Sequence, residues 1–417
     1  MSTGWKTVTL ADVCSFENGD RGKNYPGRKA FVKTGVPFIN SGHLKGGTIN
    51  TDKMNFIERE RFNLVSRGKI IKGDLLFCLR GSLGKFAIVD DISEGAIASS
   101  LIIVRPGEQL NNRYLAAYFS SQLCLAQINK FRNGAAQPNL SGKNLGLFKI
   151  PLPLLPEQKR IVAILDETFA GIDQAIANTK KNLTNAREVF ESYLNGVFIQ
   201  KDEGWTETSL VNEIELLTGF AFKSKGYSEE PNSIKLLRGD NIIQGAFRWE
   251  SAKKWSASDV DSYSKYYLRA GDVVLAMDRT WVKAGLKYAQ IEEKDLPCLL
   301  VQRVARLRPK SNLDSNFLKY LISSNEFTKY VLSIQTGSGV PHISGAQIKA
   351  FQFGKPTTAI QKKTSAELDK LHLEIQHLES IYQKKLTALA ELKQSILHKA
   401  FTGELTQTPE QELAEAC

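Results

Sequence analysis

The sequence predicts an α+β fold in which one unit occurs twice, as two β-rich mixed domains with embedded helices, separated by two long helices. Three observations predict it. Motifs recur in the same order in both halves of the chain, each copy changes from strand-like to helical patterning, and the net charge of +11 lies in the strand-like parts. We expect a pseudo-two-fold internal repeat whose long helices form an antiparallel coiled coil.

The repeat is an ordered series of matches at a nearly constant offset of roughly 200 residues. A single short match arises by chance, but a series in one order indicates a tandem duplication. The matching pairs, first copy before second, are Gly4-Trp5 and Gly204-Trp205, Gly73-Asp74 and Gly271-Asp272, Arg105-Pro106 and Arg308-Pro309, Ser120-Ser121 and Ser323-Ser324, Pro138-Asn139 and Pro341-His342, and Gln158 and Gln361.

The first part of each copy has the pattern of short strands. Runs of β-branched or aromatic residues, such as Leu75–Leu79, Phe86–Val89 and Leu101–Val104, are separated by Gly, Asn and Asp. Gly73-Asp74 and its counterpart are predicted to be turns that lead into a strand. One amphipathic helix is expected within each copy, over Arg113–Phe131 in the first and Asn316–Ser333 in the second.

The end of each copy has the pattern of one long helix. Apolar residues recur at steps of three, four or seven from Pro156 to Phe198 and from Thr358 to Phe401, which is one helical stripe. Pro156 suits a first helical position, Thr358 and Gln361 have the spacing of a capping box, and Gly403 is expected to end the second helix. The stripe residues expected in the coiled-coil seam or in partner contacts are Ile161, Leu165, Ile172, Ile176, Leu183, Leu368, Leu371, Ile375, Leu378 and Leu386.

These patterns divide the chain into five parts. The β-rich domains are predicted at residues 1–153 and 201–355, the long spacer helices at 154–200 and 356–405, and a flexible C-terminal tail at 406–417. The formal charge is +10 for residues 1–150 and +4 for 201–355, against −1 for 151–200 and −2 for 356–417. Basic domains indicate a nucleic-acid partner, whereas nearly neutral helices suit contacts with protein.

Several classes of protein are disfavoured by missing signals. No apolar run approaches the roughly 20 residues of a membrane helix. The five scattered cysteines predict neither a zinc site nor a disulfide framework, which fits a reducing cytoplasm. Nucleotide-binding and metalloprotease motifs and the Asn-Pro-Pro-aromatic run of adenine methyltransferases are missing, so we expect no metal and no cofactor in this chain. Asp278, Glu292 and Lys294 weakly match a nuclease core that the first copy lacks.

Together these motifs resemble the specificity (S) subunits of type I restriction–modification systems, the HsdS family, over the whole chain. The resemblance depends on Gly4-Trp5, on Lys72–Leu76 and on Gln137–Ser141. It depends most on the helix start Pro151–Val162, which is quite specific to that family, and on the C-terminal Ser395–Leu405. The start of the second helix, Phe353–Gln361, departs from the proline-rich pattern.

The resemblance implies two target-recognition domains, each reading one half of a bipartite DNA site, with the helix pair setting the gap between the halves. It implies a complex with two methyltransferase (M) subunits and, for cleavage, restriction/motor (R) subunits, in phage defence. S-adenosylmethionine and ATP with magnesium are then expected on those partners. The chain itself is expected to be a non-catalytic cytoplasmic subunit that binds double-stranded DNA.

The duplication separates shared from variable positions. Shared positions are expected to serve the fold, a phosphate contact or a common partner, whereas base-reading positions should differ between copies. Arg and Asn side chains suit bidentate contacts with guanine and adenine edges. For Lys85 and Lys283, which both copies share, a phosphate contact and a plain surface lysine stay equally open. The candidate DNA-binding residues, all in loops, are Lys23, Arg28, Lys29, Asn40, His43, Arg80, Lys85, Lys223, Arg238, Asn241, Arg279, Thr280 and Lys283.

Three alternatives stay open at this point. The chain could be the specificity subunit of a related methyltransferase–nuclease system outside type I, or a DNA-modifying enzyme whose motif is not recognised. A scaffold that never reads DNA is the third, and the basic excess confined to the β-rich domains argues against it.

Overall fold

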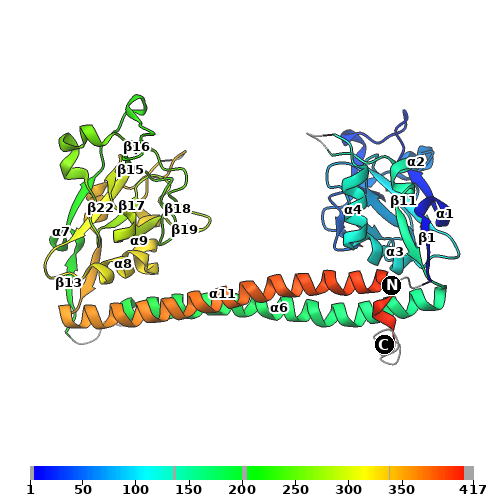
Figure 1. The fold of residues 1–417 in the computed structure, drawn as a ribbon. Helices are drawn as coiled ribbons and strands as arrows, with labels where there is room; N and C mark the ends of the chain where they lie inside the picture. The colour runs from blue at the N-terminus through cyan, green and yellow to red at the C-terminus, as the bar shows by residue number, and fades with distance from the viewer. Residues whose placement is uncertain (1–3, 135–137, 200–203, 338, 408–417) are drawn as a thin grey trace. The chain divides into compact units, whose positions relative to one another are not determined.

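The computed structural model describes residues 4–134, 138–199, 204–337 and 339–407, without the side chains of Arg28 and residues 259–261. The chain forms two compact units, Met1–Lys180 with Gln383–Cys417, and Lys181–Tyr382. Each unit contains one β-rich domain and part of both long helices, α6 (Leu155–Ile199) and α11 (Thr358–Thr402), of 45 residues each (Figure 1). Within the described ranges, no helix has the length and apolar character needed to cross a membrane.

The first domain is built on a four-stranded antiparallel sheet in the order β2-β11-β8-β9. A second sheet, β10-β4-β7-β3, contains one parallel pair, β10 with β4, and β1 pairs with β12 where the chain enters and leaves the domain. The strands are β1 (Lys6–Thr9), β2 (Cys14–Asn18), β3 (Phe31–Val32), β4 (Val36–Ile39), β5 (Leu44–Lys45), β6 (Thr48–Ile49), β7 (Asn55–Ile57), β8 (Leu75–Cys78), β9 (Phe86–Ile88), β10 (Ala96–Ile97), β11 (Leu101–Pro106) and β12 (Lys149–Leu152).

Helices cover the first sheet and close the core of this domain. Tyr114 and Tyr118 are fully buried against the sheet residues Leu75 and Phe77, in a cluster that also takes in Phe401 of α11. The helices of this unit besides α6 and α11 are α1 (Leu10–Val13), η1 (Arg28–Ala30), α2 (Arg59–Leu64), α3 (Asn112–Phe119), α4 (Gln122–Phe131), α5 (Gly142–Gly146) and η5 (Glu404–Thr406).

The second domain repeats this plan, which confirms the duplication. Its main sheet has the order β14-β22-β17-β20, and its second sheet, β16-β15-β21, again contains one parallel pair, β15 with β21. The elements are β13 (Thr206–Ser209), α7 (Leu210–Glu213), β14 (Ile214–Thr218), η2 (Ser224–Gly226), β15 (Ile234–Leu237), β16 (Lys254–Trp255), η3 (Ala257–Tyr266), β17 (Val273–Ala276), β18 (Trp281–Val282), β19 (Gly285–Leu286), β20 (Tyr288–Gln290), η4 (Glu293–Asp295), β21 (Cys298–Leu300), β22 (Val304–Pro309), α8 (Ser315–Ser323), α9 (Asn325–Ile334), α10 (Gly345–Lys349) and β23 (Gln352–Lys355).

The single embedded helix predicted in each copy is wrong, because the structure has two helices there. The break falls at the repeated serine pair. The hydroxyl of Ser121 accepts a hydrogen bond from the Cys124 amide at 3.3 Å, and that of Ser324 accepts one from the Phe327 amide at 3.2 Å. A serine that caps a new helix in this way offers the backbone an alternative to continuing the previous one.

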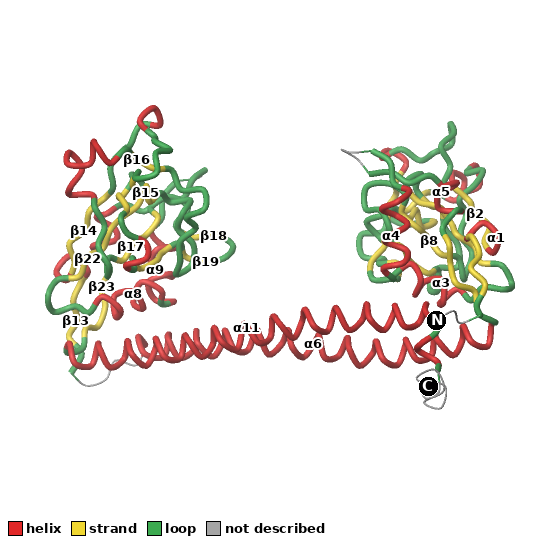
Figure 2. Tube along the Cα trace, in the orientation of Figure 1, coloured by secondary structure: helices red, strands yellow, loops and turns green. Residues whose placement is uncertain are grey.

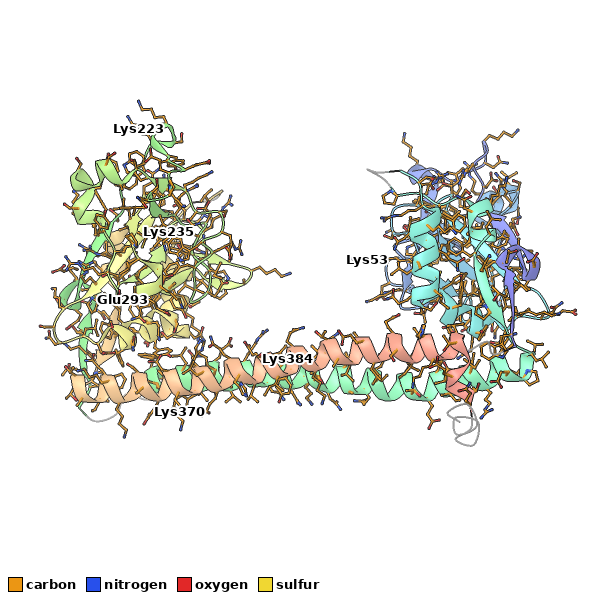
Figure 3. All side chains as sticks on the ribbon, viewed as in Figure 1. Lys53, Lys223, Lys235, Glu293, Lys370 and Lys384 are labelled. Carbon is orange, nitrogen blue, oxygen red and sulfur yellow. The ribbon has the colours of Figure 1, made fainter. Side chains whose placement is uncertain are left out.

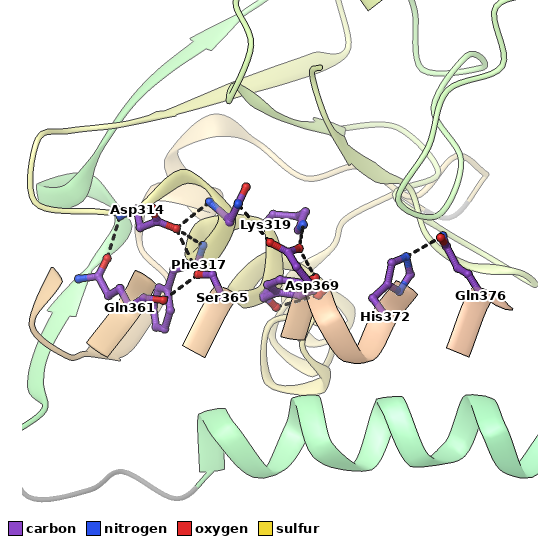
Figure 4. A network of polar contacts seen from close by, with 11 residues as sticks. Asp314, Phe317, Lys319, Gln361, Ser365, Asp369, His372 and Gln376 are labelled. Carbon is purple, nitrogen blue, oxygen red and sulfur yellow. Dashed lines mark hydrogen bonds and ion pairs between the residues drawn. The ribbon is translucent and has the colours of Figure 1, made fainter. Parts of the chain in front are cut away.

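A fully buried glutamine fastens each long helix to its own domain. The side-chain oxygen of Gln158 accepts from the Asn111 amide at 2.8 Å, and its nitrogen donates to the carbonyls of Gln109 and Pro153. Gln361 makes the same three contacts, with the Asp314 amide, which Figure 4 shows, and with the carbonyls of Asn312 and Pro356. The predicted capping box is therefore wrong, because the Gln361 side chain is used in this anchor.

The ends of the long helices were otherwise well predicted. α6 begins one residue before Pro156, and α11 ends where Gly403 adopts a left-handed φ of 81°. The flexible tail predicted from residue 406 begins too early in the sequence. Thr406 lies in η5, is buried and donates a hydrogen bond to the carboxylate of Glu157. The rest of that predicted tail, residues 408–417, lies outside the described residues.

The two long helices run antiparallel within each unit. In the first unit, Lys393 of α11 pairs with Asp173 of α6 at 2.7 Å. In the second, Arg187 of α6 pairs with Glu379 of α11, and the Tyr193 hydroxyl donates to Glu367 at 3.3 Å. Residues closer to the C-terminal end of α6 thus contact residues closer to the N-terminal end of α11.

The predicted seam residues fall into three groups. Ile161 and Leu165 belong to the core of the first domain and Leu368 to that of the second, so the helix ends are buried by their domains as well as by each other. Ile172 and Ile375 are buried. The half-buried members are Ile176, Leu183, Leu371 and Leu386.

The remaining residue, Leu378, is 37% exposed, so it lies outside the seam, and a partner contact there stays a prediction. Seven-residue steps from the buried Leu368 and Ile375 lead to the half-buried Tyr382. An α-helix has 3.6 residues per turn, so an apolar stripe drifts around it and a residue at its margin turns towards solvent.

Candidate nucleic-acid interface

The candidate loops gather at one edge of each domain. In the first, β2 and β8 both run antiparallel to β11, so both end at the edge where β11 begins. β9 also begins at this edge, since it is antiparallel to β8. The loops that follow β2 and β8 therefore lie together, and β14, β17, β20 and β22 repeat the arrangement in the second domain.

The long helices dock at the opposite edge of each domain. β11 runs away from the candidate loops to Pro106, and Gln109 and Asn111 beyond it hold Gln158 of α6. β22 likewise runs to Pro309, shortly before the residues that hold Gln361. Figure 3 shows Lys223 at the end of the second domain away from its helices, whereas Figures 1 and 2 show the hairpin of β18 and β19, between which Lys283 lies, at the side of that domain.

Most of the candidate side chains are accessible there. Asn40 and Arg238 are half-buried, and the side chain of Arg28 lies outside the described part of the chain. Arg238 forms an ion pair with the carboxylate of Asp240 at 3.4 Å, which neutralises part of its charge. The exposed candidates are Lys23, Lys29, Arg80, Lys85, Lys223, Arg279 and Lys283.

His43 and Asn241 are buried and close the same turn in the two copies. The ring nitrogen Nδ1 of His43 accepts from the Asn40 amide at 3.1 Å, and the side-chain oxygen of Asn241 accepts from the Arg238 amide at 3.1 Å. Burial lowers the pKa of His43, which fits a neutral ring with a lone pair on Nδ1. Both residues therefore serve the fold, and the structure removes them from the base-reading candidates.

Thr280 is also removed by its burial. Its side chain is 1% exposed, and its hydroxyl donates to the Met277 carbonyl at 3.1 Å, within the turn that follows β17. The neighbouring Arg279 takes a left-handed φ of 47° and is exposed. The hydrogen bond of Thr280 thus stabilises the turn, and the side chain of Arg279 within it faces solvent.

Replacing His43 with Asn is expected to leave the DNA half-site read by the first domain unchanged, because Asn241 makes the matching turn-closing hydrogen bond in the second domain. His43→Leu should destabilise the domain by about 1–3 kcal/mol, since it leaves the Asn40 amide without its acceptor. Thermal unfolding and the methylated DNA motif are the two measurements. A new motif with His43→Asn would mean that this side chain reads a base.

The two copies carry opposite charges at the centre of this edge. Arg80 pairs through its backbone with Asn139, and its counterpart Asp278 pairs in the same way with His342. Asp278 also accepts from the ring of His342 at 2.6 Å and from Arg303 at 2.9 Å. Among the described residues, the same position is therefore a cation without an ion pair in one domain and a carboxylate paired with Arg303 in the other.

Two arginines that sequence reasoning left out of the candidate set, Arg21 and Arg67, lie beside Arg80. The three line one cavity of about 260 Å³ in the first domain. Partial burial, and then the charges of Arg80 and Arg67, lower the pKa of Arg21. The sequence signal that could have pointed to Arg67 is the glycine that follows it. In the structure this Gly68 has a φ of 82°, which indicates a tight backbone approach.

The shared Gly-Asp pairs form turns before a strand, and each aspartate also forms an ion pair with an arginine of a neighbouring strand. Asp74 is 1% exposed and bonds Arg105 through both oxygens at 2.7 and 2.8 Å. Asp272 bonds Arg308 through two contacts of 2.7 Å. This planar two-point pairing is a strong form of ion pair, and it accounts for the repeated Arg-Pro motif as well.

The weak nuclease match does not assemble into a site. Glu292 and Lys294 are exposed and pair with each other at 2.6 Å, while Asp278 is engaged by Arg303 and His342. Over the described parts of the chain, no three His, Cys, Asp or Glu side chains are grouped so as to hold a metal. The described cysteines, Cys14, Cys78, Cys124 and Cys298, are all free thiols.

Two repeats of a β-rich domain, each with variable basic loops at the edge opposite paired long helices, define the class of DNA-specificity proteins. A family model described as the type I restriction modification DNA specificity domain matches residues 2–185 and 203–386. The chain belongs to this family, whose function is to give a restriction–modification system its DNA sequence specificity.

Two relatives match this chain along nearly its full length, and a third matches over part of it. The type I restriction enzyme MjaVIII specificity subunit of Methanocaldococcus jannaschii is 24% identical, over 96% of this chain and 93% of that protein. The StySPI specificity subunit of Salmonella potsdam is 26% identical, over 97% and 89%. The EcoAI specificity subunit of Escherichia coli is 35% identical over 172 residues, or 40% of this chain.

Solved structures share the fold. A chain from a structure of the type I R-M system matches with a TM-score of 0.79 at 20% identity, covering 96% of this chain and 98% of that one. The HsdS subunit from Thermoanaerobacter tengcongensis matches with a TM-score of 0.59 at 20% identity, covering 97% and 98%.

Proposed function

We propose that this chain is the specificity subunit of a type I restriction–modification complex, and that each of its domains reads one half of a bipartite site on double-stranded DNA. One observation carries the proposal: the loops that follow β2 and β14 lie at the same edge of the two repeats but differ in sequence, over residues 21–29 in one and 222–227 in the other. A scaffold with two different readers suits a target whose halves differ in sequence.

We further propose that the helix pair sets the gap between the half-sites and binds two methyltransferase subunits. Apolar side chains on the two helices stay exposed, which supports a protein partner. Among them are Val189, Ile199, Leu373, Ile381 and Leu392. S-adenosylmethionine would bind to these methyltransferase subunits, and ATP with magnesium to restriction/motor subunits that join for cleavage.

The chain is proposed to be non-catalytic. Its Asp278 carboxylate is bound by Arg303 and by the ring of His342, and its buried cysteines have pKa values raised by burial, so neither is an activated nucleophile or base. The purified chain with magnesium or S-adenosylmethionine should therefore neither cleave nor methylate DNA. Activity of the chain alone would contradict this part of the proposal.

Lengthening both helices by seven residues should widen the gap of the recognised motif by about 3 base pairs. Seven helical residues add about 10 Å, and one turn of B-DNA spans about 34 Å. The insertions belong after Lys180 and after Tyr382, where the two units meet along each helix. A seven-residue step keeps the apolar seam in phase.

The methylated motif of the assembled complex is the measurement. An insertion in α6 alone is the matched control, because it puts the two helices out of register and should impair recognition. An unchanged gap with both insertions in place would contradict a spacing role for the helices.

A further inference from the structure

The cavity of the first domain is formed where four segments of the chain meet. Asn18 ends β2, Arg21 follows it, Arg67 comes from the loop after α2, and Arg80 follows β8. The fourth segment, Asn139–Gly142, leads into α5. Arginine, asparagine and serine side chains thus face a small concave space of about 260 Å³ at the edge assigned above to DNA.

Two carboxylates, the buried Asp20 and the half-buried Glu17, hold the backbone beside two of these arginines. Asp20, which is 5% exposed, accepts from the Gly22 amide at 2.7 Å and from the amide and hydroxyl of Ser66 at 3.0 Å. Glu17 accepts from the Gly68 amide at 2.6 Å. The residues that flank Arg21 and Arg67 are therefore fixed in place.

Two glycines allow these segments to approach so closely. A Cβ on Gly68 would lie 2.9 Å from the Cα of Gly19, and Gly68 has a φ of 82° that disfavours other residues. The local backbone is thus built to bring Arg21 and Arg67 together. Among the described residues, the one hydrogen bond that these guanidinium groups donate to protein runs from Arg21 to the Ser99 carbonyl, at 3.2 Å.

The charge of this cluster is not balanced by the protein. Within the described part of the chain, no carboxylate forms an ion pair with Arg21, Arg67 or Arg80. The second domain differs, because Asp278 stands in the place of Arg80 and is neutralised by Arg303 and His342. Three converging cations without a counterion make a site for an anion.

We propose that this cavity binds a phosphate group of the DNA backbone, an inference that rests on the proposed DNA-reading function. Guanidinium groups pair with phosphate oxygens at two points, and three of them surround a tetrahedral anion better than a planar base edge. Phosphate contacts position a protein on the duplex without reading sequence. The first domain therefore supplies a phosphate clamp that the second domain lacks at the matching position.

The test measures binding of duplex DNA to the complex with its methyltransferase subunits, over a series of salt concentrations. Arg67→Gln and Arg80→Gln are suitable changes because both side chains are exposed, and thermal melting checks that each variant is folded. Each is expected to weaken binding about tenfold or more, and losing one phosphate contact should lower the slope of log K against log salt by about 0.9. The sequence of the methylated motif should not change.

Lys72→Gln is the matched control, since Lys72 is exposed and basic but precedes β8, at the opposite edge of the sheet. It should leave both the affinity and the salt slope unchanged. Inorganic phosphate, added at constant ionic strength, should compete with DNA for the unaltered complex more than for the Arg67→Gln, Arg80→Gln double variant.

Three results would overturn the inference. Unchanged affinity and slope in both arginine variants, with specific binding by the unaltered complex, would reject the clamp and leave the proposed function standing. An altered half-motif would assign the arginines to base reading. Stabilisation of the unaltered complex by inorganic phosphate, without any effect of the variants on DNA binding, would make the cavity a site for a free anion. If the unaltered complex binds DNA without sequence preference, the proposed function itself fails.

Discussion

Exchanging residues 206–355 for the matching domain of another specificity subunit is expected to change one half of the methylated DNA motif and to leave the other half intact. β13 pairs with β23 along their whole lengths, from Thr206 with Lys355 to Ser209 with Gln352, so the exchanged segment must include both strands. The helices stay in place on either side, and with them the proposed spacing of the half-sites.

The measurement for this exchange is the N6-methyladenine motif written by the assembled complex. The reciprocal exchange of residues 6–152, bounded by the paired β1 and β12, is the matched control and should alter the other half alone. The new domain must pack on Leu194, Phe198 and Leu368, which belong to the core of the second domain, so thermal melting should accompany it. A change in both halves from one exchange would contradict independent reading.

The second large effect is expected from Asp74→Ala, which should destabilise the first domain by about 3 kcal/mol. The buried carboxylate bonds Arg105 at two points and accepts from the Ile71 amide at 2.9 Å, so its removal leaves the amide unpaired and leaves Arg105 with the longer contact to Glu17 at 3.5 Å. About a third of the Arg105 side chain is exposed, so water can solvate its charge and limits the loss of stability.

Hydrogen exchange, read domain by domain, is the measurement for this change. Asp272→Ala should produce the same loss in the second domain, since Asp272 bonds Arg308 and the Arg269 amide in the same way. Asp90→Ala, at an exposed position, is the surface control. Equal destabilisation of both domains by Asp74→Ala alone would contradict two separately folded cores.

The long helices could be predicted because their signal is local. The spacing of apolar residues, the proline near the start of α6 and Gly403 at the end of α11 need no knowledge of the rest of the chain. What Gln361 does could not be predicted in this way. Its spacing from Thr358 fits a capping box, but its contacts are with Asn312 and Asp314, which come from another part of the sequence.

The candidate interface could be predicted as a set of loops but not residue by residue. His43 and Asn241 look like exposed polar readers in the sequence, whereas burial makes them turn-closing groups. Arg67 lies far from Arg21 in sequence, and the bonds of Asp20 with Ser66 and of Glu17 with the Gly68 amide hold their two segments together. Such pairings depend on tertiary packing, which a single sequence does not display.

The most direct test of the account is the pattern of N6-methyladenine across a host genome that carries the cognate methyltransferase, compared with and without this gene. We expect one split motif to appear only with the gene, as two short defined halves around an undefined gap. An unchanged methylation pattern, with the methyltransferase present and the protein made, would contradict the claim that this chain specifies the DNA sequence.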